Sequence, residues 1–215
     1  YEKKTSLDLG EGYGVQLSTN SVNILNQIGF NDLKLEDKFF PQRADFYFLK
    51  TNKEICSIDI AQFNSKDINY TTIKRSLLLE FLRDKLFTNS IQFNKKVERI
   101  NFSSSKIEIT FKNNNTDIFD YMVVADGVFS STKSILFDKN IKPKYSGLFA
   151  FRTLVKSENI KFINKNNISL FLGPNMHLVT YPVSKKNDFN LIAIIRKNLD
   201  KNYFNNKENI QNIIK

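Results

Sequence analysis

The stretch "VVADGVFSSTKSIL", residues 123–136, carries the clearest fold signal in the chain. The near-continuous apolar run that leads into it, "IFDYMVVAD" at 118–126, predicts a strand buried on both faces. Asp126 and Gly127 then predict a turn, and Ser130 is a typical N-cap for a following helix. Because ligands bind beyond the carboxyl ends of strands in open α/β sheets, this stretch predicts either a ligand-binding turn or a plain strand-turn-helix.

The rest of the chain predicts further helices and strands in a mixed order. Apolar residues at helical spacing predict helices over 18–30 and 70–87, the second capped by Thr71 or Thr72. Alternating or continuous apolar runs predict strands at 44–50, 54–60, 96–102, 106–112, 147–155, 168–173, 176–183 and 189–197. This order predicts an α/β (α+β mixed) fold with an inserted or appended antiparallel sheet.

Composition excludes several classes of protein. The chain has 215 residues, of which 41% are hydrophobic and 25% charged, as in a globular protein with a sizeable core. It has no run of about 20 apolar residues and no signal-peptide pattern. Cys56 is the only cysteine, which rules out an intrachain disulfide and a thiolate metal site and favours a reducing, cytoplasmic compartment.

The net charge of +10 raises the question of nucleic-acid binding. The lysines are spread along the whole chain among many asparagines and isoleucines, and no cluster of five or more Lys and Arg residues occurs. We therefore expect no nucleic-acid partner. A basic nucleic-acid-binding module is the alternative from a different class of protein, and it predicts strong, salt-dependent DNA binding.

Three segments hold residues that could have either a purely structural role or a role in binding or catalysis. The sequence "GEGYGV" at 10–15 is typical of a flexible turn, because it is not the dinucleotide-binding Gly-x-Gly-x-x-Gly pattern. Arg75 falls on the predicted second helix, where an arginine is usually solvated. Arg152 interrupts an apolar strand, so it needs a partner or lies on an edge strand that faces solvent.

His177 is the only histidine, and it shares a face of the predicted strand 176–183 with Tyr181. At 3.3 Å per residue, their Cα atoms would lie roughly 13 Å apart. The two side chains would therefore flank a small ring without contacting each other. Pro182 and its β-branched neighbours favour a strand over a helix here. A structural histidine is the alternative explanation.

Taken together and in this order, these segments resemble the FAD-dependent aromatic monooxygenases of the para-hydroxybenzoate hydroxylase fold. The resemblance is strongest to the salicylate hydroxylase and 3-hydroxybenzoate 6-hydroxylase group, and it covers nearly the whole chain. It rests on "YE" followed by "GYGVQLSTNSVNILNQIGF", and on "IKRSLLLEFL", "VADGVFSSTK", "GLFAFRTLV" and "GPNMHLVTYPV". The chain departs from the family pattern at Thr19, Val124, Lys133 and Phe151, where Pro, Gly, Arg and Trp are usual.

The resemblance implies a role for each matched residue. The positions that correspond to FAD contacts are Glu2, Gly14, Val15, Gln16, Arg75, Asp126, Gly127 and Ser130. Glu2 takes the place of the acidic residue that binds the adenosine ribose, and Arg75 that of an arginine at the flavin nucleotide. The Asp-Gly motif serves both FAD and the nicotinamide donor. His177 and Tyr181 take the places of a His and a Tyr that assist the chemistry at the substrate, and Arg152 is assigned to the substrate.

The same resemblance implies a domain organisation. Residues 1–40 and 68–142 would form a Rossmann-like FAD-binding domain, and residues 41–67 and 143–215 a substrate-binding β-sheet domain. The family's Gly-x-Gly-x-x-Gly strand should lie before the first residue and its late Gly-Asp motif after the last. We therefore expect a central fragment of a longer chain, which by itself is inactive and does not hold FAD stoichiometrically.

The implied function is hydroxylation of a small phenolic or benzoate-type aromatic with NAD(P)H and O₂. In the family, reduced flavin forms a C4a-hydroperoxide that attacks an activated phenol. His177 would take the phenol proton near neutral pH, and Tyr181 would orient the phenol or relay the proton. An isoprenoid-quinone hydroxylase or epoxidase of the same fold is the alternative. The sequence leaves open a homodimer and the choice between NADH and NADPH.

Overall fold

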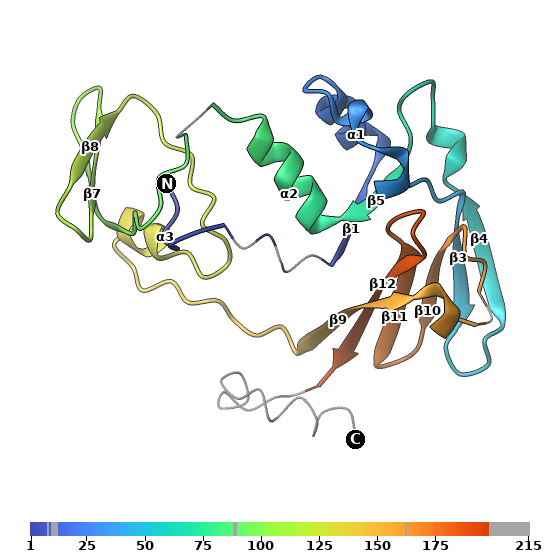
Figure 1. Ribbon diagram of the computed structural model, residues 1–215. Helices are drawn as coiled ribbons and strands as arrows, with labels where there is room; N and C mark the ends of the chain where they lie inside the picture. The colour runs from blue at the N-terminus through green and yellow to red at the C-terminus, as the bar shows by residue number, and fades with distance from the viewer. Residues whose placement is uncertain (8, 10–12, 88–89, 162, 198–215) are drawn as a thin grey trace. The chain divides into compact units, whose positions relative to one another are not determined.

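The computed structural model describes residues 1–7, 9, 13–87, 90–161 and 163–197. The chain divides into two compact units, of which the first contains Tyr1–Asp8 and Leu86–Tyr145 and the second contains Leu9–Lys85 and Ser146–Lys215. The expected mixed α/β fold is confirmed, since helices and several sheets occur together (Figure 1). The expected division into FAD-binding and substrate-binding domains concerns function and stays a prediction.

A six-stranded sheet in the order β4-β3-β10-β11-β12-β9 forms the larger part of the second unit (Figure 1). Its strands are β3 (Arg43–Phe48), β4 (Glu54–Asp59), β9 (Leu148–Lys156), β10 (Ile168–Leu172), β11 (Met176–Pro182) and β12 (Asp188–Arg196). All neighbouring strands are antiparallel except β10 and β3, which run parallel. All six strands were expected from the apolar runs, and all six are confirmed.

A smaller sheet, β1-β5-β2, completes the second unit with two helices. Its strands are β1 (Gly14–Leu17), β2 (Lys38–Phe39) and β5 (Thr71–Lys74), and the helices are α1 (Thr19–Asn26) and α2 (Arg75–Asp84). The buried side chains of Val22, Phe30, Ile73 and Phe81 pack together between these elements. Short 3₁₀ helices lie at Phe30–Asp32, Leu35–Asp37, Ala61–Phe63 and Ser157–Asn159.

The start of the second predicted helix was wrong. Residues Thr71–Lys74 form strand β5, and α2 begins only at Arg75. The β-branched run Thr71-Thr72-Ile73 favours a strand, and here it pairs with β1 on one side and β2 on the other. The predicted helix therefore began five residues too early, at Tyr70 instead of Arg75.

The glycine-rich stretch at 10–15 also differs in part from a flexible turn. Gly14 and Val15 begin strand β1, which pairs antiparallel with β5. Residues 10–12 of this stretch lie outside the described residues. Ser18 is the N-cap of α1, and Gly29 adopts the left-handed conformation (φ 88°) just beyond that helix.

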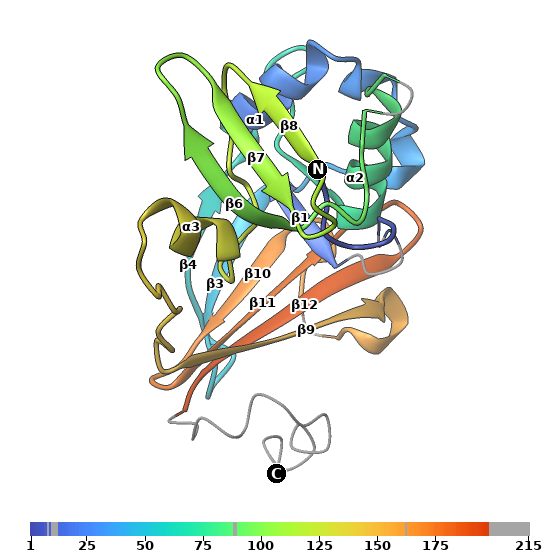
Figure 2. The same ribbon diagram turned by 90° about the vertical axis from the view of Figure 1, so that its left-hand side faces the viewer.

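The first unit contains a three-stranded antiparallel sheet and one short helix (Figure 2). Its elements are β6 (Val97–Phe102), β7 (Ile107–Phe111), β8 (Thr116–Phe119) and α3 (Ser131–Leu136). The expected meander of 96–102 and 106–112 is confirmed. Ile109 and Phe111 on β7 are its buried apolar side chains, and Phe111 packs against the ring of Tyr1.

The expectation of a buried strand reaching Asp126 was wrong for its second half. Strand β8 ends at Phe119, and the segment that follows forms no strand. Tyr121 and Val123 are 90% and 91% exposed. A strand is buried on both faces only when neighbouring strands and covering layers are present. Among the described residues, no strand pairs with this segment.

Among the described residues, none of the helices has the length and apolarity needed to cross a membrane.

Candidate active site

Three neighbouring strands of the six-stranded sheet bring several predicted site residues onto one surface. Along β11, His177, Val179 and Tyr181 alternate onto the same face. The cross-strand partners of these residues continue that face onto β12 and β9, because directly opposite residues point to the same side of a sheet. We call this surface the site face: its rows are Tyr181–Asn190–Leu154, Val179–Ile192–Arg152 and His177–Ile194–Ala150.

The site face combines an apolar floor with polar groups at its borders. Ile192 and Ile194 lie between His177 on β11 and Arg152 on the edge strand β9. From the strand spacing and the rise per residue, the Cα atoms of His177 and Arg152 lie about 12 Å apart. His177 is half-buried and Arg152 is exposed. Arg152 therefore lies on an edge strand, one of the two expected explanations, and Ala150, Arg152 and Leu154 are all on the more exposed side of that strand.

The imidazole of His177 has no hydrogen-bond or ion-pair partner among the described residues. Its neighbours across the sheet are Leu172 on β10 and Ile194 on β12, which are apolar. A structural histidine usually satisfies its ring nitrogens with protein partners. Both nitrogens of His177 are therefore available to a bound molecule.

Tyr181 lies at the covered end of the site face and is only 2% exposed. Burial raises the pKa of Tyr181 to about 12, although a hydrogen bond from Gln16 and the nearby Arg152 charge act to lower it. Gln16 on β1 also accepts a hydrogen bond from the hydroxyl of Tyr70, at 2.6 Å. The structure therefore brings Gln16 and Tyr181, both predicted site residues, close to each other.

The start of β1 packs closely against the same end of the site face. The Gly14 amide donates to Asn190 Oδ1 at 2.8 Å, and Asn190 is fully buried. A Cβ atom on Gly14 would lie 2.5 Å from Val183 Cγ1 and 2.8 Å from Tyr181 Cε2. This position is therefore restricted to glycine by the close approach of the two sheets.

Arg75 lies next to the same strand. It is the first residue of α2, its side chain is exposed, and its amide donates to the carbonyl oxygen of Tyr13 at 2.8 Å. Gly14 pairs with Lys74 in the β1–β5 ladder. Gly14, Val15, Gln16 and Arg75, which the resemblance assigns to FAD, thus lie together at one end of this small sheet.

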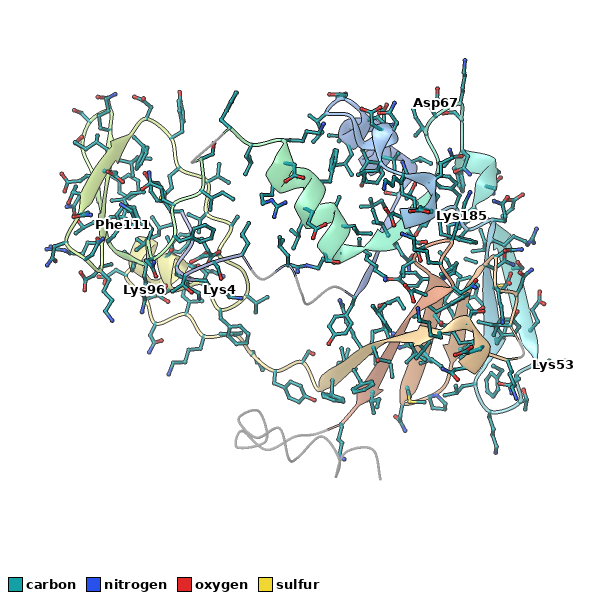
Figure 3. The ribbon with its side chains drawn as sticks, in the orientation of Figure 1. Lys4, Lys53, Asp67, Lys96, Phe111 and Lys185 are labelled. Carbon is teal, nitrogen blue, oxygen red and sulfur yellow. The ribbon has the colours of Figure 1, made fainter. Side chains whose placement is uncertain are left out.

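The first unit holds the other residues assigned to FAD. Glu2, Asp126 and Gly127 line a groove of about 600 Å³, and four lysines line it too: Lys3, Lys4, Lys95 and Lys96. Figure 3 shows Lys4 and Lys96 on neighbouring segments of this unit, with Phe111 close by. Glu2 Oε1 accepts a hydrogen bond from the Lys4 amide at 2.9 Å. Cations beside a carboxylate and an open backbone turn are a donor set that fits a nucleotide's phosphates and ribose hydroxyls.

The Asp-Gly turn is ordered by hydrogen bonds into the start of α3. Ser130 is the N-cap, and its hydroxyl accepts from the Lys133 amide at 3.0 Å, as expected. Burial acts to raise the pKa of Asp126, but hydrogen bonds from Ser130 and Thr132 outweigh it and lower that pKa. Gly127 has φ +81° and open space around it. The turn therefore presents an ionised carboxylate next to an unobstructed backbone.

Three residues of this region were missed by sequence reasoning. Asn190 holds the Gly14 amide, Tyr70 holds Gln16, and Asp188 forms ion pairs with two lysines of other strands. A polar side chain within an otherwise apolar strand was the available signal for Asn190. Among the described residues, no group of His, Cys, Asp and Glu side chains is arranged to hold a metal ion.

No family model matches the chain. The salicylate hydroxylase of Pseudomonas putida is 21% identical over 199 residues, which cover 86% of this chain and 46% of that protein. The 3-amino-4-hydroxybenzoate 2-monooxygenase of Streptomyces cremeus is 26% identical over 182 residues, 80% of this chain and 44% of the relative. The chain thus spans about half the length of these curated relatives.

Comparison with solved structures shows which known fold the chain shares. The crystal structure of HpxO from Klebsiella pneumoniae, complexed with FAD and uric acid, matches with a TM-score of 0.77 at 17% identity, covering 99% of this chain and 53% of that one. The fold is that of the FAD-dependent aromatic hydroxylases. Together with the sequence similarity to the curated aromatic hydroxylases over most of the chain, this confirms the expected resemblance.

Proposed function

We propose that this chain supplies the substrate-facing sheet and part of the flavin site of a monooxygenase that hydroxylates a small aromatic ring. In the proposed reaction, substrate, O₂, NAD(P)H and a proton give the hydroxylated substrate, NAD(P)⁺ and water. The single observation that carries the proposal is the site face, where an unpartnered imidazole and an exposed guanidinium border an apolar floor. The lone Cys56 agrees with a reducing, cytoplasmic compartment.

The apolar floor suits a flat ring. Ile192 and Ile194 offer half-buried aliphatic surface of the kind that small-molecule sites use to bury a ligand. The roughly 12 Å between the Cα atoms of His177 and Arg152 leaves room for one ring between their side chains. We therefore propose a planar aromatic substrate that lies over these two isoleucines.

His177 would act as the proton acceptor. A phenol reacts with an electrophilic oxygen donor faster once its hydroxyl is deprotonated, so a base beside that hydroxyl is useful. The imidazole fits because neither ring nitrogen is engaged by the described residues. Arg152 would pair with an anionic group on the same ring, since a guanidinium binds carboxylate oxygens in a fixed fork. Tyr181, at the covered end of the face, would orient the ring.

Each unit, taken by itself, holds residues that fit a part of FAD. Glu2 and the Asp126-Gly127 turn provide a carboxylate for ribose and an open backbone beside four lysines. Gly14, Val15 and Gln16 provide the start of β1 beside the Tyr181 end of the site face. When bound and reduced, FAD supplies the activation of O₂, while the residues of this chain bind and orient the substrate and move its proton.

The proposal is tested with the full-length protein that contains this chain, supplied with FAD, NADH or NADPH, salicylate or 3-hydroxybenzoate, and ¹⁸O₂. We expect substrate-dependent oxidation of the reduced nicotinamide and one ¹⁸O atom in each hydroxylated product molecule, measured by mass spectrometry. An oxygen atom that comes from water, or product formed without O₂, would exclude a monooxygenase. Arg152→Leu is expected to weaken binding of the ring carboxylate. Lys50→Leu, at an exposed lysine in the turn between β3 and β4, is the control for lost charge.

A further inference from the structure

A small groove in the second unit is lined by residues of helix α1, strands β2 and β5 and the segments beside them. It has a volume of about 130 Å³. We call it the Lys38 groove, and its lining includes Val22, Asn26, Phe30, Lys38, Phe40 and Thr71. None of the described residues that line it is among those assigned to FAD or to the substrate. Its polar groups therefore need an explanation of their own.

Lys38 brings a nearly buried charge to this groove, since only 3% of the residue is exposed. Its Nζ donates to the carbonyl oxygens of Phe30 at 3.1 Å and of Asn31 at 3.2 Å. An ammonium group has three protons, so one of them has no hydrogen-bond acceptor among the described residues. Its further contact is with the ring of Phe30, whose centroid lies 5.2 Å from Nζ.

The charge of Lys38 is compensated only in part. No carboxylate of the described residues forms an ion pair with its Nζ. Burial lowers the pKa of Lys38, although the charge of Asp32 acts to raise it. Because a buried charge is normally paired with an opposite charge, the ammonium group favours an anion in the groove over a neutral molecule.

Asn26 supplies the complementary group. Its Nδ2 donates to the main-chain carbonyl oxygen of Asp67 at 2.8 Å, which fixes the orientation of the amide. The other amide atom, Oδ1, is buried and has no hydrogen-bond partner among the described residues. A buried acceptor costs stability unless a donor reaches it. The Lys38 groove therefore offers one unused donor and one unused acceptor, which come from different elements.

We propose that the Lys38 groove binds a small oxyanion that retains one proton, such as hydrogen carbonate. Its charged oxygen would accept the free proton of Lys38, and its O–H would donate to Asn26 Oδ1. A cavity of this order holds a molecule of roughly six non-hydrogen atoms or fewer, and hydrogen carbonate is within that limit. Asp67 also lines the groove but is exposed, so solvent screens its repulsion of an anion. The site does not depend on the proposed reaction.

The test compares two anions that differ in one proton. Hydrogen carbonate and nitrate are both planar, singly charged oxyanions of similar size, and only hydrogen carbonate has an O–H to donate. The melting temperature of the full-length protein that contains this chain is measured against the concentration of each sodium salt, at equal ionic strength and at about pH 8. We expect hydrogen carbonate to stabilise the protein at about five- to tenfold lower concentration than nitrate, the worth of one hydrogen bond.

Asn26→Leu localises the effect, because it removes the acceptor and keeps a side chain of similar size. The preference for hydrogen carbonate should fall to about one in this variant, and Lys38→Met should weaken stabilisation by both anions. Each variant is compared with itself in the two salts, so a lower stability of the variant does not hide the result. Asn23→Leu, at an exposed position of α1, is the matched control and should keep the preference.

Equal effects of the two anions on the wild type would overturn the proposal, as would a preference that Asn26→Leu retains. If Lys38→Met does not fold, these two comparisons still decide the outcome. A crystal structure of the full-length protein grown with hydrogen carbonate gives a direct view of the groove. An ordered water, in place of the anion, between Lys38 Nζ and Asn26 Oδ1 would also contradict the proposal.

Discussion

The backbone amide of Gly14 donates to the side-chain oxygen of Asn190 across 176 residues of sequence, at 2.8 Å, in a fully buried position. This bond fastens the start of β1 onto strand β12 at the covered end of the site face. The amide nitrogen of Asn190 has no partner among the described residues. The contact uses the side-chain oxygen of Asn190 as acceptor. Its side-chain nitrogen is left as an unsatisfied buried donor, which costs free energy.

Gly14→Ala should destabilise the protein by about 1–3 kcal/mol, because the added methyl group overlaps buried atoms. The new Cβ would lie 2.5 Å from Val183 Cγ1, too close for any rotamer change to relieve fully. The free energy of unfolding in urea is the measurement. Val183→Ala removes the nearest obstacle, so the double variant should be less destabilised than the sum of the two single variants. Strict additivity would show that the overlap with Val183 is not the cause.

Asp188→Asn should weaken the protein at neutral pH and make its stability less dependent on pH in acid. Burial acts to raise the pKa of Asp188, but hydrogen bonds from Lys156 and Lys74 outweigh it and lower that pKa. A depressed carboxyl pKa contributes stability above the unfolded value of about 3.9, and this is lost as the pH falls through the folded-state pKa. We expect a loss of about 1.5–3 kcal/mol at pH 7, measured by urea unfolding.

The matched control for this change is Asp84→Asn, which removes an exposed carboxylate paired with Arg83. Exposed pairs contribute about 0–1 kcal/mol, so little change is expected at either pH. Equal losses in both variants would mean that net charge, and not the buried ion pairs of Asp188, sets the acid stability.

The strands of the large sheet were predictable because each carries its own apolar pattern. Runs such as Met176–Pro182 and Asp188–Arg196 are long enough, and rich enough in β-branched residues, to specify a strand without help from distant residues. The shared face of His177 and Tyr181 followed from the two-residue period of a strand and is confirmed.

The misplaced start of α2 was not predictable in this way. Thr71–Lys74 is a strand because β1 and β2 lie on either side of it, and both are distant in sequence. The prediction of a buried strand through Val123 was wrong for a related reason. The composition of this run suits a buried strand, but no described strand pairs with it and Val123 is exposed. The hydrogen bonds of Asn190 and Tyr70 likewise depend on how sheets pack, which local patterns do not encode.

Tyr181→Phe should reduce the decrease in the free energy of unfolding that occurs as the pH rises into the alkaline range. Burial raises the pKa of Tyr181 from its ordinary value near 10 to about 12, despite the lowering effects of Gln16 and Arg152. A raised folded-state pKa contributes stability that is fully present below pH 10 and is lost as the pH rises toward 12. Urea unfolding at pH 9 and pH 11 measures the difference. Tyr13→Phe, which changes a 40% exposed ring, should retain the wild-type pH dependence.

In the full-length protein that contains this chain, His177→Leu should abolish or strongly reduce hydroxylation while leaving the fold intact. The imidazole has no described hydrogen-bond partner and lies among apolar neighbours on β11, so leucine should change the free energy of unfolding by less than about 0.5 kcal/mol. If the imidazole takes the substrate proton, product formation should fall by about 10²- to 10⁴-fold. Oxidation of NAD(P)H should continue without product, and the comparison of product with NAD(P)H consumed measures this uncoupling.

A variant that unfolds more easily but still hydroxylates would identify His177 as a structural residue. Val179→Leu, one row away on the same face, controls for added bulk, and it should keep the coupling of NAD(P)H oxidation to product.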